Sequence, residues 1–135
     1  MKTQTMSLSL LVLSAPFDSQ ASYSAYRFAE AALKQDTKID RIFFYQSGIH
    51  NASNLACTPR DEFDLYTAWQ ALKQAYELDL VVCIAAAARR GLVNEAEQKR
   101  HQKSSFNMAP EFELSGLGQL VEAIASSGKL ITFGE

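Results

Sequence analysis

The sequence predicts an α/β protein of three layers, with a mostly parallel sheet of four to five strands between two layers of helices. Short apolar runs alternate along the chain with segments of helical apolar spacing, which is typical of strand–helix–strand units. The strand-like runs are apolar throughout rather than at every second residue, as expected where both faces of a parallel strand are buried. A length of 135 residues and 47% hydrophobic content fit a single domain with its own core, spanning residues 1–135.

The first part of the chain contains two predicted strands joined by a helix. Residues 8–13 form the first strand. A helix follows from Ser22 or Ser24, because apolar residues then recur three and four positions apart at Ala25, Phe28, Ala29, Ala32 and Leu33. Residues 39–45, which are rich in isoleucine and aromatic residues, form the second strand, and the polar segment 46–58 is largely loop.

A second helix and the most apolar strand follow. Residues 58–61 (Thr-Pro-Arg-Asp) are typical of a helix entrance, with a capping hydroxyl, a proline at the first helical position and an acid near the helix start. The inner face of this helix contains Leu65, Ala68, Trp69, Leu72 and Tyr76. Residues 78–85 form the next strand, with the possible start of another helix after Cys83.

The last part of the chain is less regular. We expect a polar helix over residues 94–103 and an irregular segment over residues 104–113. A helix from Ser115 to the Ser127–Gly128 pair, followed by a strand over residues 129–133, completes the fold. The apolar residues of this last helix, which we expect to face inward, are Leu117, Leu120, Val121 and Ile124.

The N-terminus superficially imitates a secretory signal. Its apolar run is short and is interrupted by serines, so a buried first strand after a loose extension over residues 1–5 is the better interpretation. No stretch reaches the ~20 apolar residues of a membrane span. Two cysteines do not make a disulfide framework. We therefore expect a cytoplasmic protein without membrane contact.

The charge balance disfavours direct nucleic-acid binding. Fifteen acidic and thirteen basic residues give a formal net charge of -2, with no basic stripe to attract phosphates. The Gly116-Leu117-Gly118 motif has no convincing strand before it, which weakens the case for nucleotide binding. His50 and His101 have no cysteine or carboxylate at a recognised ligand spacing, so we expect neither a metal nor an organic cofactor.

Ligands of parallel sheets collect at the carboxyl ends of the strands, and Cys83 lies at such an end. The small residues that follow leave room for a visiting group, and the positive charges of Arg89 and Arg90 come soon after. Positive charge and helix amides favour the thiolate, which is the nucleophilic form. The alternative is an inert buried cysteine. Cys57, in a polar loop, is either a resolving partner or an incidental thiol, and no CxxC motif is present.

Five blocks of residues, in order and spacing, resemble the TusD group of the DsrE/DsrF-like family over nearly the whole chain, from Leu8 to Phe133. The blocks are Phe43-Phe44-Tyr45, then Gly48-Ile49 with Asn51-Ala52, then Asp61-Glu62-Phe63-Asp64-Leu65 with Trp69-Gln70, then Cys83-Ile84-Ala85-Ala86-Ala87 with Arg89-Arg90-Gly91, then Leu114-Ser115-Gly116-Leu117-Gly118. The resemblance implies a three-layer α/β/α fold and a persulfide carrier whose functional cysteine is Cys83. Cys57 matches no residue that the family requires.

The resemblance also implies partners. Cys83 would accept sulfane sulfur from a TusA-like donor and pass it to a TusE-like acceptor, for 2-thiolation of the tRNA wobble uridine. TusB- and TusC-like chains would complete a dimer of heterotrimers. Residues 106–112, from Phe106 to Phe112, are hydrophobic in a polar region; they form either a partner-contact loop beside the thiol or a loop folded onto the core.

Two other functions remain open at this point. A DsrE-like carrier in dissimilatory sulfur oxidation would use similar chemistry with another donor and acceptor. A non-catalytic subunit would only hold its partners together, although the presence of Cys83 within its matching block argues against that.

Overall fold

The computed structural model describes residues 7–134, so the extension expected at residues 1–5 lies outside the described residues. Five parallel strands form one sheet in the order β4-β3-β2-β1-β5. Their bounds are β1 (Ser7–Val12), β2 (Lys38–Phe44), β3 (Leu80–Cys83), β4 (Glu113–Ser115) and β5 (Lys129–Phe133). The predicted α/β class is confirmed, and the sheet is parallel throughout.

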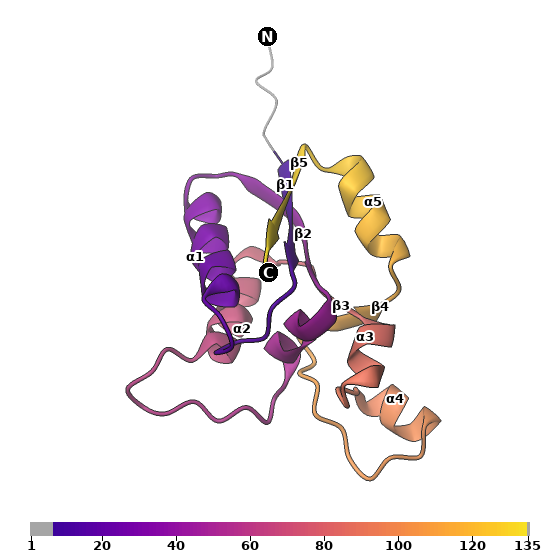
Figure 1. Ribbon diagram of the computed structural model, residues 1–135. Helices are drawn as coiled ribbons and strands as arrows, with labels where there is room; N and C mark the ends of the chain where they lie inside the picture. Colours follow the sequence, from indigo (N-terminus) through magenta and orange to yellow (C-terminus); the bar gives the residue numbers. More distant parts are fainter. Residues whose placement is uncertain (1–6, 135) are drawn as a thin grey trace.

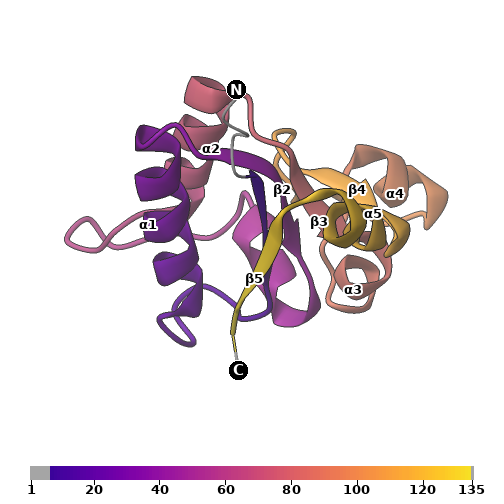
Figure 2. The same ribbon diagram turned by 90° about the horizontal axis from the view of Figure 1, so that it is seen from above.

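Helices lie on both faces of this sheet, as Figures 1 and 2 show. On one face, α1 (Ala21–Lys34) packs beside α2 (Leu65–Tyr76), and on the other lies α5 (Gly118–Ser126). The 3-10 helix η1 (Gln46–Ala52) contacts β3 and α3 (Ile84–Arg89), and α4 (Glu95–Arg100) follows α3. No helix among residues 7–134 combines the length and the hydrophobicity that crossing a membrane would require.

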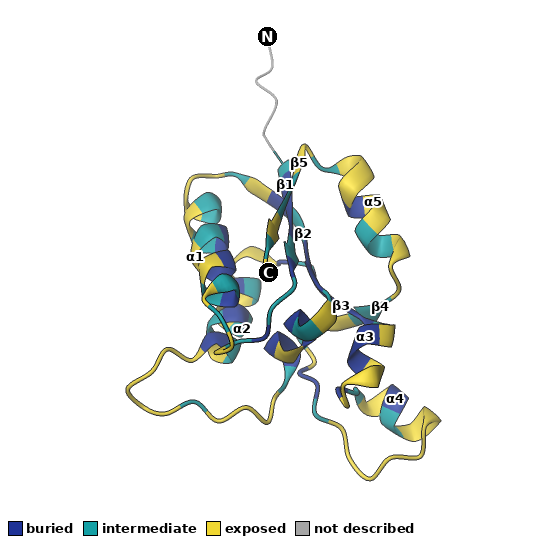
Figure 3. Ribbon diagram, in the orientation of Figure 1, coloured by how far each residue is buried: buried dark blue, intermediate teal, exposed yellow. Residues whose placement is uncertain are grey.

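The core lies mainly between the sheet and the helices α1 and α2, where the inward faces are buried (Figure 3). Trp69 of α2 is its largest fully buried side chain. Its ring meets Phe44 of β2 and Tyr26 of α1 edge-on, with ring centroids 5.5 and 5.4 Å apart. Such edge-to-face pairs add to the free energy that burial of the rings already contributes. Of the residues predicted to face inward, Ala25 and Ala29 of α1 are buried. On α2, Leu65, Trp69 and Leu72 are buried as predicted, whereas the prediction is wrong for Tyr76, which is 41% exposed.

Several predicted boundaries are wrong, among them the end of the polar helix, since α4 ends at Arg100 rather than at residue 103. The second helix begins at Leu65 rather than near residues 58–61, because Asp64 caps it: the Asp64 carboxylate accepts from the backbone amide of Thr67 (3.2 Å) and from its hydroxyl (2.8 Å). The strand predicted over residues 78–85 is shorter, since α3 begins directly after Cys83. Residues 46–58 are not all loop, because the first seven form η1.

The last helix differs most from the prediction. A short strand, β4, occupies part of the region expected to be irregular or helical, and α5 begins only at Gly118. Its apolar residues do not all face inward: Val121 is 64% exposed and Ile124 52%, and Leu117 just before the helix is 44% exposed. The one residue of α5 that is buried is Ala123.

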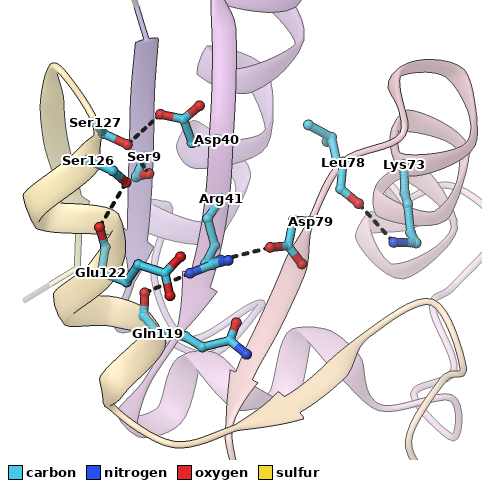
Figure 4. A network of polar contacts seen from close by, with 10 residues as sticks. All are labelled: Ser9, Asp40, Arg41, Lys73, Leu78, Asp79, Gln119, Glu122, Ser126 and Ser127. Carbon is cyan, nitrogen blue, oxygen red and sulfur yellow. Dashed lines mark hydrogen bonds and ion pairs between the residues drawn. The ribbon is translucent and has the colours of Figure 1, made fainter.

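Polar contacts explain this orientation of α5 (Figure 4). Arg41 of β2 donates from Nε to Asp79 (2.7 Å) and from Nη1 to the carbonyl of Gln119 at the start of α5 (2.9 Å). At the other end of the helix, Ser127 donates to Asp40 (2.7 Å) and lies 2.6 Å from the hydroxyl of the buried Ser9. Hydrogen bonds to the sheet therefore hold α5, and its apolar stripe is left outside.

Candidate active site

The carboxyl ends of the strands meet at one edge, where hydrogen bonds tie the following loops together. The backbone amide of Tyr45, just after β2, donates to the carbonyl of Val12 at the end of β1 (3.0 Å). In η1, the amide of Gly48 donates to the carbonyls of Leu13 (3.2 Å) and Tyr45 (2.9 Å). The segments that follow β1 and β2 are thus brought together at this edge.

A buried polar network fixes η1 at this edge. Asn51 accepts from the indole Nε1 of Trp69 (3.0 Å) and donates from Nδ2 to the hydroxyl of Ser22 (3.0 Å) and the carbonyl of Gly48 (2.9 Å). Ser22 in turn donates to the carbonyl of Ser14 (2.7 Å). Each hydrogen bond gives a partner to a buried polar group that would destabilise the fold if it had none. The network therefore holds η1, α1 and α2 in one arrangement.

Cys83 is the last residue of β3, at this same edge. It is paired in register with Ser115 of β4, and α3 starts at the next residue, as the sequence suggested. The expectation of an open space beside the thiol is wrong, because Cys83 is only 2% exposed and belongs to the core cluster. Two residues further on, Ala85 is exposed. The thiol is therefore buried, on a strand that contacts β4, α3 and η1.

The two arginines do not flank the thiol. α3 extends between them and Cys83, and six residues at a rise of about 1.5 Å place Arg89 roughly 9 Å along the helix from the cysteine. Arg90 turns back and donates to the carbonyl of Ala86 (3.2 Å). Arg89 and Arg90 therefore lie at the end of α3 that is far from the thiol.

The other candidate residues lie apart from Cys83. Cys57 is exposed in the loop after η1, where its thiol donates to the carbonyl of Leu55 (3.4 Å), and both cysteines are free. His50 is exposed, and His101 lies 3.0 Å from Glu97 of α4. Over residues 7–134 no group of three or more histidine, cysteine or acidic side chains is positioned to hold a metal ion.

Residues 106–112 fold mainly onto the core. Met108, Ala109 and Phe112 are buried, and the Phe112 ring meets Phe44 at 5.4 Å between centroids. Phe106, at 43% exposure, is the large apolar residue of this segment that faces solvent. Of the two interpretations, packing on the core therefore describes most of the segment, and partner contact remains open for Phe106.

The Gly116-Leu117-Gly118 motif does follow a strand, contrary to the sequence interpretation, because β4 ends at Ser115. Adding a Cβ at Gly116 or Gly118 would meet nothing within 4 Å, so neither glycine is needed for a close approach between segments of this chain. The motif connects β4 to α5.

The sequence model of the DsrE/DsrF-like family matches residues 6–133. The chain belongs to this family. Among curated DsrE/DsrF-like relatives, the "Sulfurtransferase TusD homolog" of Pseudomonas aeruginosa is 49% identical over 119 residues, covering 88% of this chain and 91% of the relative. The "Sulfurtransferase TusD" of Proteus mirabilis is 44% identical over 92% of this chain and 95% of the relative. The DsrE protein of Allochromatium vinosum is 45% identical over 96% of this chain and 100% of the relative.

The DsrE/DsrF-like fold is also seen in a solved structure. The YchN protein of Escherichia coli superposes with a TM-score of 0.75 at 18% identity, covering 96% of this chain and all (100%) of that one. At this identity the likeness concerns the fold alone. Sequence reasoning placed Cys83 at the carboxyl edge of the sheet, as observed, but it missed the network of Asn51, Trp69 and Ser22. These residues are far apart in the sequence, and local residue patterns do not predict contacts over such separations.

Proposed function

We propose that this DsrE/DsrF-like protein is a sulfurtransferase that carries sulfane sulfur as a persulfide on Cys83. The observation that supports the assignment most directly is the place of Cys83, at the carboxyl end of β3 with α3 starting at the next residue. The relatives named as TusD sulfurtransferases match this chain over most of its length, which supports the activity independently of the residue.

The chemistry is two successive sulfur exchanges. The Cys83 thiolate attacks the terminal sulfur of a donor persulfide; its S–S bond breaks, the donor leaves as a thiolate, and a persulfide forms on Cys83. An acceptor thiolate then attacks that terminal sulfur and regenerates the Cys83 thiolate. Each step breaks one S–S bond and forms another, so no external oxidant or reductant is consumed. Neither step needs a metal ion or an organic cofactor.

Because Cys83 is buried, this chemistry requires that the sulfur first become accessible to a partner's thiol. At 2% exposure in the chain alone, the sulfur is not open to a partner's thiol. Transfer therefore requires a local opening of the elements around it, η1, α3 and β4. α3 is a short helix, only six residues long. Local opening of a short element needs less free energy than global unfolding.

The proposed route is that of the TusD relatives: sulfur arrives from a TusA-like donor and leaves to a TusE-like acceptor, for 2-thiolation of the tRNA wobble uridine in the cytoplasm. A second candidate is supported by the 45% identity to the DsrE protein of Allochromatium vinosum, which favours a carrier role in dissimilatory sulfur oxidation. Both routes use the same Cys83 chemistry, and they differ in which donor and acceptor proteins exchange sulfur with it.

Loading with sulfur tests the site. A cysteine desulfurase with a TusA-like carrier is expected to add one sulfur atom to Cys83, measured by mass spectrometry of peptides that contain each thiol. The exposed Cys57 serves as an internal control, because it should react faster than Cys83 with a small alkylating reagent and yet remain without sulfur. Sulfur on Cys57, or equally on both residues, would contradict the proposal.

We also propose assembly with TusB- and TusC-like chains as a dimer of heterotrimers. The apolar stripe of α5 supports an interface, since Val121 and Ile124 are more than half exposed, at 64% and 52%.

A double substitution on α5 tests this assembly. Val121→Lys with Ile124→Lys should change the stability of the free chain by less than about 0.5 kcal/mol per site, because both residues are exposed. The same variant should no longer copurify with coexpressed TusB- and TusC-like chains. Gln74→Lys with Ala75→Lys, exposed on α2, is the matched control. An intact complex in the α5 variant would rule out this stripe as the contact.

A further inference from the structure

A cavity of about 440 Å³ lies at the far end of α3 from Cys83, and we call it the cationic groove. It is formed by three separate parts of the chain: the loop after η1, the end of α3, and the segment after α4. Its lining residues are Leu55, Ala88, Arg89, Gly91, Val93, Lys103, Ser104, Ser105 and Asn107. None of the chemistry described above uses this groove.

The two cations of the groove have no acidic partner among residues 7–134, unlike the basic side chains of the nearby helix α4. Within α4 and just after it, acids neutralise the basic side chains: Lys99 lies 3.3 Å from Glu95, and both Arg100 and His101 contact Glu97. Arg89 and Lys103, by contrast, form no side-chain hydrogen bond or ion pair with any of residues 7–134. Arg90, which does not line the cavity, bonds to a backbone carbonyl rather than to an acid, so the cations that face the cavity without a partner are Arg89 and Lys103.

The groove is held in shape by Asn107. Its side chain accepts from the backbone amide of Val93 (2.9 Å) and donates to the carbonyl of Gly91 (2.9 Å). Its backbone carbonyl accepts from the amide of Asn54 (2.8 Å), which fixes the loop that carries Leu55. One residue therefore joins all three walls, and a partner that binds here meets a surface already formed.

One large apolar side chain lines the groove together with the two cations, and a second belongs to the same chain segment as Lys103. Leu55 is 66% exposed and lines the groove, and Phe106, 43% exposed, is adjacent in sequence to the groove residues Ser105 and Asn107. An apolar side chain next to charged groups is typical of protein–protein interfaces. A charged phosphate backbone would make no favourable contact with the apolar side chain of Leu55. The net charge of -2 and the acids Asp61 and Glu62, in the same loop as Leu55, also disfavour a nucleic acid.

We propose that the cationic groove docks the protein that exchanges sulfur with Cys83, through a segment of that protein in which carboxylates flank an apolar side chain. The carboxylates pair with Arg89 and Lys103, and the apolar side chain packs on Leu55. This inference rests on the proposed function. Because α3 connects the groove directly to Cys83, a partner held there is in contact with one of the elements that must move to open the thiol.

Charge reversal tests the groove. Arg89→Glu with Lys103→Glu is expected to slow sulfur transfer at subsaturating partner concentration by about tenfold, with the TusA-like donor, the TusE-like acceptor, or both. Loading of Cys83 by a small neutral persulfide should stay at the wild-type rate, because that reagent needs no docking. Lys34→Glu with Lys129→Glu, on α1 and β5, makes the same change in net charge away from the groove and should have no effect.

The outcomes separate docking from chemistry. Wild-type protein that never takes sulfur on Cys83 refutes the proposed function itself. The docking proposal is overturned if Arg89→Glu with Lys103→Glu exchanges sulfur at the wild-type rate with both the donor and the acceptor. It is also overturned if loading by the small persulfide falls as much as loading by the proteins. A variant that transfers sulfur normally and loses only tRNA binding overturns it as well. The neutral pair Arg89→Gln with Lys103→Gln should give a smaller loss, and the wild-type rate should fall with rising salt.

Discussion

Cys83→Ser is expected to abolish sulfur transfer, with the rate falling at least about 10³-fold. A serine hydroxyl is not ionised near neutral pH and cannot hold a sulfane sulfur, so both exchange steps are lost together. The substitution is nearly isosteric, and it costs about 1–2 kcal/mol if the buried hydroxyl finds no partner. The relay rate, followed by the mass of the acceptor protein, and the thermal melting midpoint are the two measurements.

Cys57→Ser is the matched control, because it removes a thiol from an exposed loop position. Its transfer rate should equal that of the wild type, and its melting midpoint should not change. If Cys83→Ser retains transfer while Cys57→Ser loses it, the assignment is reversed. If both variants retain transfer, the protein acts only as a scaffold for its partners. A folded Cys83→Ser protein without activity, beside a fully active Cys57→Ser protein, is the result that we expect.

The regular elements of the fold were predictable because strong local signals agree with their tertiary environment. The strand predicted over residues 129–133 is β5 as observed, and the first two strands differ from prediction by about a residue at each end. Asn94, the expected start of the polar helix, caps α4 by accepting from the amide of Glu97 (2.9 Å). At each of these places the spacing of the apolar residues and the residues at the ends of the element indicate the same secondary structure.

The errors arose where distant residues decide the outcome. The apolar spacing of α5 predicted a buried face, but Arg41 and Asp40 of β2 hold the helix by its polar groups and carbonyls instead. Residues 58–61 have suitable capping chemistry, yet Asp64 caps the helix further along the chain. The exposure of a thiol likewise depends on what packs over it, so the spacing predicted the place of Cys83 at a strand end but not its burial.

Gly48→Ala is expected to destabilise the fold by about 3 kcal/mol, enough to lower the melting midpoint by roughly 10 °C. A Cβ at this position would lie 2.1 Å from the carbonyl oxygen of Val12 and 2.8 Å from its carbon, so the obstacle is backbone that no rotamer change can remove. Gly116→Ala is the control, because nothing lies within 4 Å of its Cβ and the backbone there needs no positive φ. That variant should melt within a few degrees of the wild type.

The same substitution should also make Cys83 more accessible in the protein that remains folded. To relieve the contact with Val12, η1 must move away from the end of β1, which strains the hydrogen bonds from the amide of Gly48 to Leu13 and from Asn51 to the carbonyl of Gly48. Since η1 packs on β3 and α3, its displacement alters the cover over Cys83. Alkylation of Cys83 in Gly48→Ala should therefore become faster than in the wild type. An unchanged alkylation rate, with the expected loss of stability, would mean that η1 is not part of that cover.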